Sequence, residues 1–94
     1  MGDDEALARR SRLRLIADVL EAVAAHEGEP ATRLATLTNM AYDRFARLAA
    51  ELEEKGLIER LPGGGYRLTG KGRSLLRELR RLRRLLDDLG LDLA

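Results

Sequence analysis

The feature that most restricts the fold of this chain is the stretch Pro-Gly-Gly-Gly at residues 62–65. It separates two short strand-like runs at residues 57–61 and 66–69. Proline and consecutive glycines supply the backbone angles that a tight hairpin loop demands. The sequence therefore predicts one β-hairpin in a chain whose other segments carry apolar residues at helical spacing, which is a mainly α (α+β) fold.

Three helices are expected before the hairpin. The first begins around Arg10, and Gly28 ends it. Pro30 lies near the first turn of a short second helix over about residues 31–37, where its missing amide hydrogen costs nothing. The third covers about residues 41–55, with Gly56 as its left-handed C-terminal cap. The expected buried positions, at spacings of three and four, are Leu13, Ile16, Ala17, Leu20, Val23, Ala24, Leu34, Leu37, Phe45, Leu48, Ala49 and Leu52.

Thr38 and Asn39 lie between the second and third helices, and their side chains supply acceptors that are typical of a turn or a helix cap. Two helices joined by a turn of three or four residues form a helix-turn-helix. With the hairpin directly after it, this unit predicts a winged helix-turn-helix with a two-stranded wing.

Leucines at a spacing of four, three, four and three mark a last helix over about residues 70–89. This spacing is a heptad seam, about two and a half heptads long, which is short for a freestanding coiled coil. Two interpretations stay open: the seam faces a partner chain, or the helix packs on its own domain. Leu76 can do the latter while the others face a partner. The expected dimerisation residues are Leu75, Leu79, Leu82, Leu86 and Leu89.

The length of 94 residues suits one domain with a single core. We expect a flexible N-terminus at residues 1–9, a winged helix-turn-helix at 10–69 and a dimerisation helix at 70–94. Hydrophobic residues make up 45% and charged residues 35% of the chain, which indicates a folded protein. Because the chain shows neither a secretory signal nor an apolar stretch of about 18 residues, a cytoplasmic location is expected.

Three strings, at residues 40–48, 52–58 and 66–72, resemble the small archaeal winged-helix DNA-binding proteins that dimerise through an antiparallel coiled coil. In that family a tyrosine-bearing recognition helix runs into Leu-x-x-Lys-Gly-Leu-Ile. A hairpin follows, and Tyr-x-Leu-Thr-x-Lys-Gly opens the long helix. The resemblance covers about residues 10–90. It implies a homodimeric transcription regulator or chromatin-associated protein that binds double-stranded DNA and uses no cofactor.

The sequence departs from that family at two points. Ala41 stands where members often carry a hydroxyl residue, which weakens the expectation of a phosphate contact there. Members are also commonly richer in lysine, whereas Lys55 and Lys71 are the only lysines among 17 basic residues. A GC-rich or heat-adapted genome would explain the arginine bias equally well. The net charge of +1 argues against a strongly basic packaging protein.

Positions outside the buried stripe of the third helix would enter the major groove. There arginine can donate two hydrogen bonds to the two acceptors of guanine, and tyrosine can donate to a phosphate or pack on a thymine methyl. Because Asp43 and later glutamates repel phosphate, a solvated helix face remains the alternative. The expected DNA contacts are Tyr42, Arg44 and Arg47 on this helix, Arg33, Thr38 and Asn39 before it, and Arg60 and Arg67 on the wing.

The wing arginines would follow a minor groove or the backbone without reading sequence, or they are simply exposed strand residues. The last helix carries an outward basic stripe, which is either the solvated back of a coiled coil or a second DNA contact. Asp87 and Asp88 would lie close to the arginine-rich start of an antiparallel partner helix. The stripe consists of Arg73, Arg77, Arg80, Arg81, Arg83 and Arg84.

Enzyme chemistry finds almost no support. The chain has no cysteine and a single histidine, which leaves no thiol nucleophile and no zinc set. Residues 65–71 match the spacing Gly-x-x-x-x-Gly-Lys of a phosphate loop, but Gly72 follows instead of the Ser or Thr that would hold magnesium. No membrane or small-molecule partner is evident. The alternative function is a winged-helix module that joins proteins: Asp43 fits it, whereas Arg44 and Arg47 contradict it.

Overall fold

The computed structural model describes residues 10–91, which form four helices and a two-stranded antiparallel sheet. The winged helix-turn-helix that the sequence predicts is confirmed. The predictions for residues 1–9, and for 92–94 at the end of the expected dimerisation helix, concern segments outside the described residues. Along the chain, the elements are α2 (Arg12–Ala25), α3 (Ala31–Leu37), α4 (Tyr42–Glu54), β1 (Ile58–Arg60), β2 (Tyr66–Leu68) and α5 (Gly70–Asp88).

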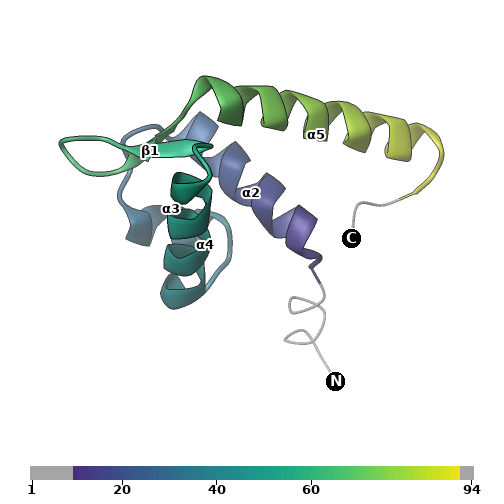
Figure 1. The fold of residues 1–94 in the computed structure, drawn as a ribbon. Helices are drawn as coiled ribbons and strands as arrows, with labels where there is room; N and C mark the ends of the chain where they lie inside the picture. Colours follow the sequence, from purple (N-terminus) through teal and green to yellow (C-terminus); the bar gives the residue numbers. More distant parts are fainter. Residues whose placement is uncertain (1–9, 92–94) are drawn as a thin grey trace.

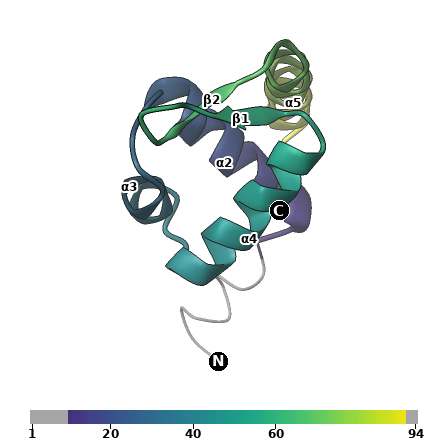
Figure 2. The same ribbon diagram turned by 60° about the vertical axis from the view of Figure 1, so that its left-hand side comes forward.

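Helix α2 occupies the centre of the fold, between α5 and the helix-turn-helix (Figures 1 and 2). The Ser11 side chain begins it by accepting a hydrogen bond from the Arg14 amide at 2.9 Å. Since α2 contacts α3, β2 and α5, its buried surface is wider than one helical stripe. The sequence prediction was therefore partly wrong: Leu13 and Ala24 are exposed, whereas residues 15 and 19, which it missed, are buried leucine and valine.

Helices α3 and α4 form the helix-turn-helix, and residues 38–41 connect them. The predicted stripe of α4 is confirmed, since Phe45, Leu48, Ala49 and Leu52 are all buried. Leu37 was predicted to be buried and is 40% exposed. Thr38 takes the inward position at the end of this short helix instead.

The wing lies against the rest of the domain at two glycines. A Cβ on Gly65, which has φ of +79°, would lie 2.4 Å from the carbonyl carbon of Gly28. A Cβ on Gly72 would lie 1.9 Å from the carbonyl oxygen of Leu57. Only glycine permits either approach, so the hairpin is held against the turn after α2 at one end and against the start of α5 at the other.

Within the wing, Ile58 pairs with Leu68, Glu59 with Arg67, and Arg60 with Tyr66. Alternation along these strands turns Ile58, Tyr66 and Leu68 into the core and leaves Glu59 and Arg67 on the outer surface. Thr69 then begins α5, because its hydroxyl accepts a hydrogen bond from the Gly72 amide at 3.0 Å.

The two halves of α5 have different surroundings. Leu76 and Leu79 are buried in the core of their own chain. The second half extends beyond the other elements (Figure 1) and exposes Leu82, Leu85 and Leu89. The seam predicted from the sequence is therefore divided: its first half packs on its own domain, and its second half is free.

An ion pair joins α2 to α5 near the point where they cross. Arg80 donates to both carboxylate oxygens of Glu21, from Nε at 3.1 Å and from Nη2 at 2.5 Å. Hydrogen bonding from Arg80 lowers the pKa of the Glu21 carboxyl. A carboxyl with a lowered pKa stabilises the fold above its ordinary pKa, and this contribution is lost as the pH falls through the lowered value. Both side chains are partly exposed to water, so the contribution is small.

Candidate nucleic-acid interface

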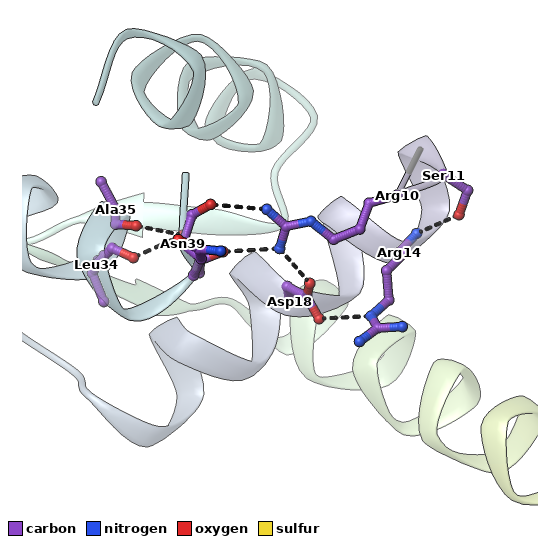
Figure 3. A network of polar contacts seen from close by, with 8 residues as sticks. Arg10, Ser11, Arg14, Asp18, Leu34, Ala35 and Asn39 are labelled. Atoms are coloured by element: carbon purple, nitrogen blue, oxygen red, sulfur yellow. Dashed lines mark hydrogen bonds and ion pairs between the residues drawn. The ribbon is translucent and has the colours of Figure 1, made fainter. Parts of the chain in front are cut away.

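The turn between α3 and α4 is fixed by Arg10, which lies just before α2 (Figure 3). Its guanidinium donates to the carbonyl oxygens of Thr38 at 2.9 Å and Asn39 at 3.0 Å, and to the Asp18 carboxylate at 3.0 Å. Asp18 also accepts from Nε of Arg14 at 3.3 Å. A cation at the carbonyl end of a helix stabilises that end, so Arg10 both caps α3 and joins the turn to α2.

The turn also holds itself together. Asn39 has φ of +56°, a left-handed conformation that asparagine tolerates better than most residues. The Thr38 hydroxyl donates to the carbonyl oxygens of Leu34 at 2.9 Å and Ala35 at 3.1 Å, and this residue is only 5% exposed. The structure therefore places Thr38 inside the turn, whereas Asn39 is exposed beside the start of α4.

The exposed face of α4 presents the side chains that the sequence singled out. Tyr42 is 51% exposed, and Asp43, Arg44 and Arg47 are also exposed. Among residues 10–91, neither Arg44 nor Arg47 has an ion pair or a side-chain hydrogen bond. The same holds for Arg33 on α3 within that range, so three guanidinium groups of the helix-turn-helix remain available to a ligand.

The N-terminus of α4 has no side-chain cap. Ala41 stands at the capping position and makes no side-chain hydrogen bond. The first amides of a helix lack partners within the helix and carry the positive end of its dipole. A DNA phosphate is a suitable partner for these amides. Ala41 thus removes the hydroxyl contact expected from the family but leaves the backbone contact open.

Two further arginines, which were not predicted as part of this surface, lie beside α4. A shallow pocket between the start of α2 and α4 is lined by Arg10 and Arg12 from one side and by Arg44 and Arg47 from the other. Arg12 forms an ion pair with Glu51 across this pocket. No short-range pattern signals this arrangement, because it depends on how α2 crosses α4.

The wing arginines differ from those of the helix-turn-helix because both are held within the chain. Arg60 lies 3.6 Å from the Glu53 carboxylate, donates to the Tyr66 hydroxyl at 3.2 Å, and stands over the Tyr66 ring. Arg67 forms an ion pair with Glu59 on the neighbouring strand. The loop between the strands carries three glycines, so the tip of the wing offers backbone but few side chains.

The start of α5 meets the end of α4, where Lys71 donates to the carbonyl oxygen of Lys55 at 3.1 Å. Beyond this point α5 runs across α2 and away from α4 (Figures 1 and 2). Four arginines near the start of this region, including Arg67, line a second open pocket at the junction of α2, β2 and α5. The stripe therefore adjoins Arg67 of the wing rather than Arg44 and Arg47 of α4.

Within residues 10–91 no group of three or more His, Asp or Glu side chains is placed to hold a metal ion. None of the helices in that range is long and apolar enough to cross a membrane.

Comparison with known proteins identifies the fold independently. The sequence model of the winged helix-turn-helix family matches residues 9–87. No curated protein sequence matches the chain. Among solved structures, it is similar to a MarR family transcriptional regulator from Silicibacter pomeroyi, with 28% identity and a TM-score of 0.70 over 90% of this chain and 63% of that one.

Two other solved structures are similar. The transcriptional repressor CouR, bound to p-coumaroyl-CoA, has 27% identity and a TM-score of 0.68, over 90% of this chain and 65% of its own. A protein of unknown function from Listeria innocua has 28% identity and a TM-score of 0.67, over 81% of this chain and 55% of its own. The chain thus spans less than two thirds of the length of each. Two of the three are transcription regulators, which supports a DNA-binding regulator in general terms.

Replacing Arg10 tests whether it holds the turn. Arg10→Gln removes three charge-assisted hydrogen bonds from a largely buried group, and we expect the free energy of unfolding to fall by about 1.5–3 kcal/mol. Urea denaturation followed by circular dichroism measures this. The control is Arg81→Gln, which breaks an exposed pair with Glu78 and should cost less than about 1 kcal/mol. Equal losses in both variants would show that the turn does not depend on Arg10.

Proposed function

Because the chain belongs to the winged helix-turn-helix family, we propose that it is a transcription regulator that binds double-stranded DNA with α4 in the major groove. The observation that carries this proposal is the pair Arg44 and Arg47, which are exposed on α4 and have no partner within residues 10–91. A guanidinium that is free of internal partners binds guanine edges and phosphates well. Tyr42 is exposed at the start of the same helix and adds a donor and an apolar ring.

The other contacts follow from their places around α4. Arg33, the exposed Asn39 and the first amides of α4 would bind the phosphate backbone and set the position of the helix in the groove. Arg60 and Arg67 would bring the wing to the backbone or the minor groove. In this proposal the protein is not an enzyme, uses no cofactor, and acts in the cytoplasm on nucleoid DNA.

We further propose that two copies associate through the second half of α5. Exposed leucines in a contiguous group are costly in water, and Leu82, Leu85 and Leu89 form such a group with the partly buried Leu86. Leu79 already packs in its own core, so the proposed interface moves toward the C-terminal end of the predicted seam. On this division, residues 10–69 bind DNA and 70–94 dimerise.

An antiparallel arrangement fits the charges of α5. Its arginines lie at residues 73–84, and Asp87 and Asp88 stand at its end. Antiparallel pairing would bring these opposite charges together, whereas parallel pairing would align like charges. The resemblance of residues 52–58 and 66–72 to the small archaeal dimeric proteins supports the same arrangement.

A protein-joining module is the second candidate, and the acidic residues of α4, the exposed Asp43 and Glu54 among them, favour it. The unpaired Arg44 and Arg47 weigh more heavily, since they lie three residues apart on one side of the helix in its first two turns, whereas the glutamates stand in its last turn. CouR is described with p-coumaroyl-CoA, but we propose no small-molecule ligand for this chain.

Two double substitutions that remove the same charge, one on α4 and one on α5, test the DNA contact of α4. We expect the unmodified protein to bind a mixed-sequence duplex in the micromolar range or tighter, and to bind more weakly as salt rises. Arg44→Gln combined with Arg47→Gln should weaken binding by about tenfold or more. Fluorescence anisotropy measures the Kd. Arg81→Gln combined with Arg84→Gln on α5 is the control and should change it by less than about twofold. Folded protein that binds no duplex at low salt would refute the function.

The proposed dimer is tested in the same way. Leu82→Glu combined with Leu86→Glu places two charges in the apolar surface, and light scattering should report a monomer with unchanged helix content. Arg84→Glu changes the net charge by the same amount on the opposite side of α5 and should leave the dimer intact. A dimer that survives in the leucine variant would place the interface elsewhere.

A further inference from the structure

Three glutamates flank the proposed DNA-binding surface, and each holds an arginine of that surface. Glu51 and Glu53 stand two residues apart near the end of α4, so their side chains leave opposite sides of the helix. Glu59 follows on β1. The three ion pairs, which we call the guard pairs, are Arg12 with Glu51, Arg60 with Glu53, and Arg67 with Glu59.

The guard pairs divide the arginines of this surface into two classes. Arg33, Arg44 and Arg47 lie on the helix-turn-helix and have no partner among the described residues. Arg12 begins α2, and Arg60 and Arg67 lie on the strands of the wing. Each of the three forms an ion pair with a glutamate. Arg44 and Arg47 of the free class lie on the helix proposed to approach base edges, whereas the held class lies where contacts would go to the backbone.

Carboxylate and phosphate compete for the same fork of guanidinium donors. All six side chains of the guard pairs are at least one third exposed, the least exposed being Glu51 at 36%. Exposed ion pairs are weak, so a DNA phosphate is able to displace the glutamate. The displaced carboxylate stays beside the phosphate and repels it, which lowers the gain from each backbone contact.

We propose that Glu51, Glu53 and Glu59 limit sequence-independent DNA binding by occupying the arginines that would otherwise bind the backbone, so that affinity depends on what α4 contacts. This inference rests on the proposed function. It assigns the three glutamates a role in specificity, because backbone contacts raise the affinity for every sequence whereas contacts from α4 raise it for some.

Neutral glutamine in place of each glutamate tests the inference. We expect Glu53→Gln and Glu59→Gln each to tighten binding to a mixed-sequence duplex by about 2- to 5-fold. The combined variant should also show a steeper dependence of log Kd on log salt, because no carboxylate is left to take up cations when the phosphate arrives.

Glu78→Gln is the matched control. It removes the same charge from an exposed pair with Arg81 on α5, 3.6 Å apart, which lies away from α4. If the gain came only from net charge, Glu78→Gln would tighten binding as much as Glu53→Gln, and the inference would be overturned. A gain confined to the guard-pair variants supports it.

Arg60→Gln supplies a second measurement that a change in net charge alone would not reproduce. Added to Glu53→Gln, it should abolish the gain in affinity, whereas in the unmodified protein it should cost little because Arg60 is already held. Equal effects of Arg60→Gln in both backgrounds would contradict the inference.

The two proposals fail in distinguishable ways. Binding by the unmodified protein with no gain in the guard-pair variants overturns the inference alone. Absence of binding by every folded variant at low salt overturns the function and the inference together. Thermal unfolding of each variant is the control for folding, and we expect these exposed substitutions to leave the fold intact.

Discussion

The burial of α2 is the constraint on which the other elements depend. Val19, Leu20 and Val23 are fully buried, and this helix contacts α3, β2 and α5. The helix-turn-helix, the wing and the last helix therefore share one core in a chain of only 94 residues. Arg10 extends the same dependence to the surface, because it reaches from the start of α2 to the turn before α4. The position of the proposed recognition helix is thus set by a helix that lies behind it.

This arrangement separates the tasks of the molecule. The exposed side of α4 holds arginines without internal partners, whereas the arginines around it are paired with glutamates. The second half of α5 leaves the core and carries exposed leucines away from α4 (Figure 1). A regulator built in this way would read DNA with one surface and join a second copy with another. Ion pairing, rather than the number of arginines, would decide which contacts contribute most to affinity.

Local patterns predicted most of the fold. The stripe of α4, the glycine hairpin and the left-handed Gly56 depend on residues close together in the sequence, and each is confirmed. The prediction failed where tertiary packing decides: α2 is surrounded by several elements, so its buried side includes Leu15 and excludes Leu13. Exposure of the site residues on α4 could be predicted from spacing. Which arginines of the interface are paired with glutamates could not be predicted, because every guard pair joins different elements of the fold.

The central claim is that the exposed side of α4 and the wing form the DNA interface. Titration of isotope-labelled protein with a short duplex, followed by amide chemical shifts, tests it most directly. We predict that the largest changes fall at residues 39–47, with smaller changes across residues 59–67, and that residues 73–84 of α5 change little. Changes concentrated on the arginines of α5, with α4 unaffected, would contradict the account.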